Sequence, residues 1–332
     1  MSKQSTLTIM AVRHPPKMKA KPCTEPRFRP STWPSPPEER VIRSSLSATF
    51  TVITAPIFFL LCLTLSQGLA VAASWEHLDT SNLELRSAAV SVVDDQGRRI
   101  VARNAQTVRP IASITKLMTA IVVLDSGVDL GEEVTITDAD RDRVRHSRSR
   151  IRVGRARLPR RELLLVALMS SANRAAAALG RTTFPGGTES FVAAMNEKAR
   201  QVGMSDSQFV DATGLDAGNQ ASADDLVRLV REAGRYPLIR EFTTTSEAFV
   251  RPYADAGDVG FRNTNPLVNN PLWQLELSKT GYINESGRCL VMQVQMYGRR
   301  VYVVLLGSVG KLTPVGDSNR LRKWIAAELG SG

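Results

Sequence analysis

Strand-like segments stand at both ends of the globular part of this chain, and a long helical block separates them. Two apolar runs, 88–93 and 99–102, flank Asp94-Asp95-Gln96-Gly97, a pattern typical of a β-hairpin. Three more strand-like runs, 275–283, 288–297 and 300–308, come near the end. The first pair can join the last three only if the chain returns to the same sheet. We therefore expect an α+β fold with one five-stranded antiparallel sheet and a helical insertion.

The region between the two groups of strands has helical composition in several places, whereas residues 135–159 are polar, basic and irregular. After the last strand, apolar residues from Leu321 to Leu329 recur at helical spacing, which predicts a closing helix. The sequence predicts the other helices at 114–124, 161–169, 174–180, 189–202 and 224–233.

The first 73 residues have the features of an export signal. Nine lysine and arginine residues precede residue 44, and residues 44–73 contain no charged side chain. The apolar stretch ends in Leu69-Ala70-Val71-Ala72-Ala73, whose small residues suit a signal peptidase. These features predict a cleaved secretory signal and an exported mature protein. A single membrane span is the alternative, since about 20 apolar residues suffice for one.

The lead before this apolar stretch is long and proline-rich, which favours a true start near Val41. With cleavage near Ala73, residues 74–86 form a polar lead and residues 87–332 form one domain, which we expect to be the catalytic domain.

Histidine and cysteine are scarce, with three of each in the whole chain. A zinc site needs three or four ligands, and a Ser-His-Asp hydrolase needs a core histidine, so we expect neither. Cys23 and Cys62 are lost with the signal, which leaves the mature chain without an internal disulfide. Cys289 lies in an apolar run and is expected to be a buried thiol.

Ser113-Ile114-Thr115-Lys116 opens a predicted helix, and the spacing of three places both end residues on one helix face. A serine hydroxyl needs a base, and a lysine amine can serve if burial or a second cation keeps it neutral. This motif alone is weak, because Ser308-Val309-Gly310-Lys311 also matches it; we interpret the second match as chance.

Two further motifs follow in order. Ser171-Ala172-Asn173 lies between two apolar helices, where a helix cap or turn would also explain it. Lys279-Thr280-Gly281-Tyr282 lies on a predicted strand, where the glycine admits a close substrate backbone. An exposed strand end would also explain this third motif. Together, the three motifs on helix, loop and strand are far more specific than any one of them.

The ordered set S-x-x-K, S-x-N, K-T-G resembles the penicillin-recognising serine hydrolases. Within them, the chain resembles the D-Ala-D-Ala carboxypeptidase family, and there the endopeptidases of the penicillin-binding protein 7 type. The resemblance runs from about Ala88 to the C-terminal helix. It implies a β-lactamase/transpeptidase-like fold, with an antiparallel sheet flanked by helices and an inserted helical subdomain. Its segments include SITKLMTA, SRSRIRVG, LMSSANRAAAALG, DATGLD, NTNPLV and LSKTGYINESGRCLVMQ.

The resemblance implies catalytic roles for four residues. Ser113 is the acylating nucleophile, and Lys116 is the general base that takes its proton. Ser171 relays the proton to the leaving amine. Asn173 binds the substrate carbonyl and helps to position Lys116.

The third motif is then the substrate-binding strand. Lys279 and Thr280 bind the substrate carboxylate, and Lys279 supplies a like charge that keeps Lys116 neutral. Gly281 leaves room for the substrate, and the backbone N–H groups of Tyr282 and Ser113 form the oxyanion hole. No metal or cofactor is needed.

The implied function is that of a periplasmic serine DD-endopeptidase for cell-wall remodelling. It cleaves D-Ala–diaminopimelate cross-links between peptidoglycan stems through an acyl-enzyme on Ser113, and β-lactams inhibit it covalently. The motifs are the same in a D-Ala-D-Ala carboxypeptidase, but longer relatives of that kind add a β-rich domain and an anchor helix, which we expect this chain to lack. A β-lactamase is disfavoured, because no glutamate from Glu189 to Glu276 lies in an E-x-x-L-N context. The three intact motifs disfavour a non-catalytic scaffold.

Residues 141–161 contain ten arginines and one acidic residue, Asp142. Such a density suits phosphates, but nucleic acid is not an expected partner outside the cytoplasm. A solvated surface is the simplest interpretation, and peripheral contact with the anionic wall or membrane surface is the alternative.

Overall fold

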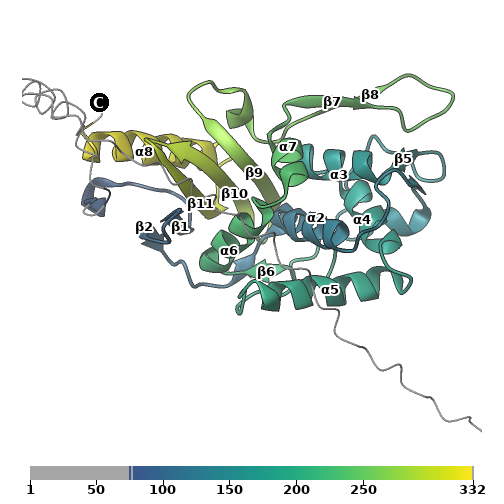
Figure 1. The fold of residues 1–332 in the computed structure, drawn as a ribbon, viewed down its shortest axis with the longest axis horizontal. Coiled ribbons are helices and arrows are strands. Elements are labelled where there is room, and N and C mark those ends of the chain that lie inside the picture. The colour runs from purple at the N-terminus through teal and green to yellow at the C-terminus, as the bar shows by residue number, and fades with distance from the viewer. Residues whose placement is uncertain (1–74, 76–77, 331–332) are drawn as a thin grey trace, which may run out of the picture. The chain divides into compact units, whose positions relative to one another are not determined.

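The computed structural model describes Trp75 and residues 78–330, and it contains the five-stranded antiparallel sheet that the sequence predicts (Figure 1). The strand order is β2-β1-β11-β10-β9, so the N-terminal hairpin adds directly to the C-terminal strands. In the central pairing, Ala89 lies opposite Leu306 and Asp94 opposite Val301. The strands of this sheet are β1 (Ala89–Asp94), β2 (Arg99–Arg103), β9 (Gln274–Ile283), β10 (Gly287–Met296) and β11 (Arg299–Ser308).

The two faces of the sheet are covered by separate apolar layers. Val303 and Leu305 of β11 pack with the residues of α8 (Thr313–Glu328), whereas Val304 and Leu306 pack into the helical side of the molecule. Side chains of a strand alternate between faces, so a strand covered on both sides becomes a continuous apolar run. That is why β10 and β11 are recognisable in the sequence.

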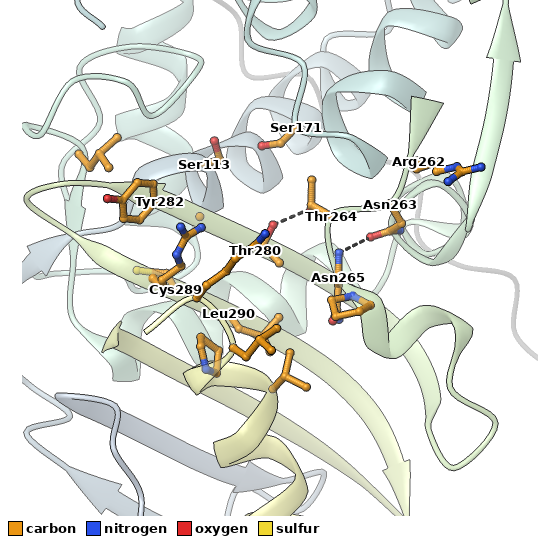
Figure 2. Close-up of a pocket in the computed structure, with 18 of the residues that line it drawn as sticks. Ser113, Ser171, Arg262, Asn263, Thr264, Asn265, Thr280, Tyr282, Cys289 and Leu290 are labelled. Atoms are coloured by element: carbon orange, nitrogen blue, oxygen red, sulfur yellow. Dashed lines mark hydrogen bonds between the residues drawn. The ribbon is translucent and has the colours of Figure 1, made fainter. Parts of the chain in front are cut away.

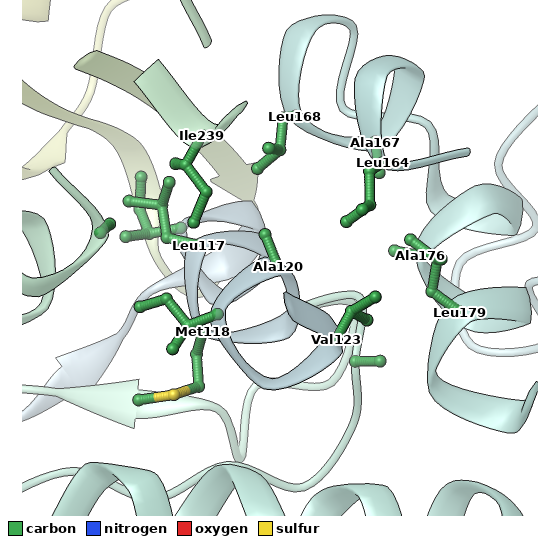
Figure 3. Packing of buried hydrophobic residues seen from close by; sticks show 14 of the residues in the cluster. Leu117, Met118, Ala120, Val123, Leu164, Ala167, Leu168, Ala176, Leu179 and Ile239 are labelled. Carbon is green, nitrogen blue, oxygen red and sulfur yellow. The ribbon is translucent and has the colours of Figure 1, made fainter. Parts of the chain in front are cut away.

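The helix α2 (Thr115–Asp125) lies at the centre of the helical side. Its residues from Thr115 to Val123 are all buried, so it is enclosed on every side instead of having one solvated face. Figure 3 shows Leu117, Ala120 and Val123 on this helix among side chains of its neighbours, such as Leu164. The surrounding helices are α3 (Arg160–Met169), α4 (Asn173–Thr182), α5 (Gly187–Gln201), α6 (Ala223–Ala233) and α7 (Pro237–Thr244).

The predicted helices and strands are all present, but the region between residues 233 and 275 holds elements that the sequence did not reveal. The helix α7 begins at Pro237, at a position where a missing N–H group costs no helical hydrogen bond. The hairpin of β7 (Glu247–Val250) and β8 (Val259–Arg262) is too short to show a clear alternation. Its two strands extend beside α3 (Figure 1).

Short elements complete the chain and fix its loops. Residues 135–159, predicted as irregular, contain little regular structure: the last residue of one short strand, one short 3-10 helix and a second short strand that pairs with the first. The small ladders are β3 (Arg109–Pro110) with β6 (Gln220–Ala221) and β4 (Glu133–Thr135) with β5 (Arg157–Pro159). The 3-10 helices are η2 (Thr80–Asn82), η3 (Ala112–Ile114), η4 (Asp138–Asp140) and η5 (Pro266–Asn269).

The predicted polar lead, 74–86, is attached to the domain. Trp75 and Leu85 are buried in the apolar layer beneath α8, and the Ser87 N–H group donates to Asp317 of that helix at 2.7 Å. The predicted signal segment, 44–73, and the proposed start at Val41 lie outside the described residues. Among the residues that are described, none of the helices is both long and apolar enough to cross a membrane.

Candidate active site

The turn that precedes α2 presents Ser113 to a groove of about 950 Å³ (Figure 2). Ala112, the residue before it, has φ +47°, a left-handed conformation that residues with side chains rarely adopt. Ser113 then lies one helical turn from Lys116, and the Lys116 Nζ atom donates to Ser113 Oγ at 2.8 Å. The spacing of three thus brings the hydroxyl and the amine into contact.

Lys116 is buried and has three oxygen acceptors. Besides Ser113 Oγ, its Nζ atom donates to Asn173 Oδ1 at 2.8 Å and to the Thr213 carbonyl at 2.5 Å. Burial lowers the pKa of Lys116 to about 7, although the nearby carboxylates of Asp211 and Asp142 act in the opposite direction. Near neutral pH the amine therefore exists partly in the uncharged form, which can accept a proton.

The second motif occupies the turn between α3 and α4. Ser171 has φ +61° there, so this turn, like the turn at Ala112, is held in an uncommon backbone conformation. Asn173 is the first residue of α4, and its Nδ2 atom donates to Ser147 Oγ at 3.1 Å. This contact turns the Asn173 carbonyl oxygen toward Lys116.

The third motif lies on β9, the edge strand of the sheet. Lys279 is buried and donates to Ser171 Oγ at 3.0 Å and to the Thr280 carbonyl at 2.9 Å. Burial, and next the charge of Lys116, hold the pKa of Lys279 well below its usual range. The repulsion between the two ammonium groups therefore adds to burial in lowering the pKa of Lys279, whereas the low pKa of Lys116 comes from burial.

Gly281 lets β9 lie directly against the nucleophile turn. A Cβ atom at this position would lie 2.9 Å from the Ile111 carbonyl oxygen and 3.2 Å from the Ser113 nitrogen. The next residue, Tyr282, is half-exposed at the groove, and the Arg288 guanidinium lies 4.0 Å from the centre of its ring. A side chain at 281 would displace the strand from Ser113.

Asp211 is part of the site, although the sequence analysis did not select it. Its carboxylate accepts from Thr213 Oγ1 at 2.7 Å, from the Gly214 N–H group at 2.6 Å and from the Asp216 N–H group at 2.9 Å. These bonds shape the loop whose Thr213 carbonyl receives Lys116. The DATGLD segment belongs to the resemblance, but nothing in its spacing reveals this backbone contact.

The structure brings all the predicted site residues together. Lys116 and Lys279 lie beneath the groove, each bonded to a serine at its surface. In Figure 2, Tyr282 and Arg262 stand toward opposite ends of the groove. The predicted residues that line it are Ser113, Ser171, Asn173, Thr280, Gly281 and Tyr282.

Cys289 is buried, as the sequence predicts, and it also lines the groove. Thr264, which the sequence analysis did not single out, accepts from Thr280 Oγ1 at 2.6 Å within the groove. No three His, Cys, Asp or Glu side chains come together as a metal site across Trp75 and residues 78–330.

Comparisons with known families, curated proteins and solved structures all find enzymes that are named for D-alanyl-D-alanine or DD-peptide chemistry. Residues 76–310 match the profile of a family described as D-alanyl-D-alanine carboxypeptidase. The chain is 44% identical over 271 residues to the D-alanyl-D-alanine endopeptidase of Pseudomonas aeruginosa, covering 80% of this chain and 87% of that one. It is 39% identical over 257 residues to the D-alanyl-D-alanine endopeptidase of Escherichia coli, covering 77% and 82%. The crystal structure of the Streptomyces K15 DD-transpeptidase matches with a TM-score of 0.68 and 25% identity, over 74% of this chain and 98% of that one.

Proposed function

The chain belongs to the D-alanyl-D-alanine carboxypeptidase family, and from this premise we propose that it is a serine DD-endopeptidase that cuts D-Ala–diaminopimelate cross-links in peptidoglycan. The observation that carries the chemistry is the 2.8 Å contact between Ser113 Oγ and a buried Lys116 whose pKa is about 7. The relatives named D-alanyl-D-alanine endopeptidase support the choice of substrate.

In the first step, neutral Lys116 takes the proton from Ser113 as Oγ attacks the D-Ala carbonyl carbon. The Asn173 and Thr213 oxygens hold the lysine while its lone pair faces Ser113. The oxyanion accepts from the N–H groups of Ser113 and Tyr282, which Gly281 allows to lie close together. One such donor contributes about 3–4 kcal/mol to stabilisation of the transition state.

In the second step, the scissile C–N bond breaks and the departing amine needs a proton. Lys116 gives back the proton it took from Ser113, and Ser171 relays it to the amine, because the Ser171 hydroxyl lies in the groove and is bonded to Lys279. Thr280 and Thr264 bind the carboxylate next to the scissile bond, and the buried Lys279 supports them from beneath the groove. Neutral Lys116 then takes a proton from the water that attacks the ester carbonyl, and it gives this proton to Ser113 Oγ as the ester C–O bond breaks.

A second candidate is a D-Ala-D-Ala carboxypeptidase, which the family description favours and which would use the same groups. The two activities differ only in the leaving amine, a single D-Ala or a whole second stem. β-Lactams offer the same reactive carbonyl, so they acylate Ser113 and inhibit both activities.

Residues 1–73 are proposed to direct export and to be removed, which places the mature domain, 87–332 with its packed lead, in the periplasm. The basic stretch 141–161 is proposed to contact the anionic wall through those of its arginines that lack an ion-pair partner.

Digestion of purified sacculi tests the proposal. We expect cross-linked dimer muropeptides to be converted to monomers. Loss of terminal D-Ala alone would establish the carboxypeptidase instead. Binding to sacculi without either change would indicate a non-catalytic scaffold, and rapid turnover of nitrocefin would indicate a β-lactamase.

A further inference from the structure

Most of the charge in the basic stretch 141–161 is compensated. Seven of its ten arginines form ion pairs with carboxylates from neighbouring segments. Within the described residues, Arg148, Arg150 and Arg152 form none. The uncompensated charge is therefore concentrated in one short segment.

This segment is held beside the active site. Ser147 accepts from Asn173, and the Ile151 carbonyl accepts from the Arg174 guanidinium at 2.7 Å. On the other side, Tyr253 donates to the Arg150 carbonyl at 2.7 Å and accepts from the Arg152 N–H group at 2.8 Å. The backbone of 147–152 is thus fixed between the start of α4 and the residues that follow β7.

Arg148 and Arg150 line a second groove, of about 580 Å³, which we call the basic groove. Its walls also include Phe249 and Arg262 from the β7–β8 hairpin. It meets the first groove at four residues that line both: Ser171, Asn173, Glu247 and Arg262. Glu247, 3.6 Å from Arg262, is the one carboxylate among the residues that line the basic groove. Three arginines line it, Arg148, Arg150 and Arg262, so its net charge is positive.

We propose that the basic groove binds the peptide stem that departs when a cross-link is cut, through the free carboxylates of that stem. This inference rests on the proposed endopeptidase activity. One stem stays on Ser113 as the acyl group, and the other leaves from Ser171, at the junction of the two grooves. Guanidinium groups pair well with carboxylates, and stem peptides carry free carboxylates on their glutamyl and diaminopimelyl residues. A single D-Ala leaving group carries only the carboxylate next to the scissile bond, so it has no further carboxylate for the basic groove.

The test measures kcat and KM of Arg148→Gln, Arg150→Gln and the double variant, because these two arginines line only the basic groove. The substrates are a soluble cross-linked muropeptide dimer and a monomeric pentapeptide. KM for the dimer should rise about threefold for each arginine removed, the size of one exposed ion pair. Its kcat, the cleavage of the pentapeptide and acylation by penicillin should stay at their wild-type values.

Two matched variants sharpen the result. Arg155→Gln removes an exposed arginine of the same stretch that is paired with Asp255 outside both grooves, and it should leave KM for the dimer unchanged. Glu247→Gln removes the single acid of the basic groove and should lower KM for the dimer, an improvement that structural damage does not produce.

Equal changes on both substrates, or an unchanged KM for the dimer in the double variant, would overturn the assignment of the basic groove while the endopeptidase activity stands. If wild-type protein releases D-Ala from the pentapeptide but leaves the dimer intact, the proposed endopeptidase activity is refuted. The proposed binding of a departing stem is then refuted as well.

Discussion

The chain contains two Ser-x-x-Lys sequences, and their surroundings differ in every respect that matters for chemistry. Ser113 lies in a groove and touches a buried lysine. Ser308 is buried at the end of β11, where its hydroxyl bonds to Ser87 Oγ at 2.8 Å. Lys311 is exposed on the turn beyond it; it lines the groove but forms no hydrogen bond with Ser308. The comparison shows that two conditions make the motif reactive. The start of a helix must bring the serine and lysine side chains into contact, and burial must exclude water from the lysine amine.

Ser113→Ala gives the largest expected difference between the two sites. Removal of a nucleophile lowers the rate of a serine peptidase about a millionfold, so labelling by a fluorescent penicillin should fall below detection. Ser308→Ala should be labelled like the wild type. Persistent labelling of the Ser113 variant, or loss in the Ser308 variant with an unchanged melting temperature, would contradict the comparison.

Lys116→Met comes next, because it removes the base but keeps the apolar stem of the side chain. General-base catalysis contributes about 10²–10⁴-fold, and the acylation rate should fall by that factor. Lys311→Met is the control and should acylate at the wild-type rate. Stopped-flow measurement of penicillin acylation separates the two variants.

The pH dependence of acylation tests the environment of Lys116. The reactive form is the uncharged amine, whose fraction decreases as pH falls below the pKa of about 7. The acylation rate should therefore decrease about tenfold for each pH unit below 7 and level off above it. A midpoint near the ordinary pKa of a lysine would show that burial does not lower the pKa of Lys116 in solution.

Asp211→Asn gives the smallest of these effects. The new amide group would meet the Asp216 N–H group, which now donates to the carboxylate at 2.9 Å, so a donor would face a donor. The unpaired groups should cost about 1–3 kcal/mol of unfolding free energy, which thermal melting measures. Because the loop places Thr213, acylation should also slow, about tenfold by the same energy scale. Asp216→Asn, a change in the same loop, should leave the acylation rate near that of the wild type.

The sequence predicts the sheet and the three motifs because both leave regular signals. Strands β10 and β11 are apolar on both faces, and Ser113 and Lys116 are related by a helical spacing. The Thr213 carbonyl leaves no such signal, since any residue type supplies a carbonyl and only the folded loop brings it to Lys116. The basic groove is hidden for a similar reason: Arg148 and Arg262 are distant in the sequence and meet only because the unpredicted β7–β8 hairpin folds beside α3.

The pairing of Ala89 with Leu306 has a consequence for biogenesis. Strand β1 occupies an interior place in the sheet, yet its neighbour β11 is synthesised only after the whole helical insertion. Contacts between such distant parts of a polypeptide form late and slowly. The nascent chain therefore keeps an open hydrogen-bonding edge at β1 until β11 has been synthesised, and only then can the sheet close.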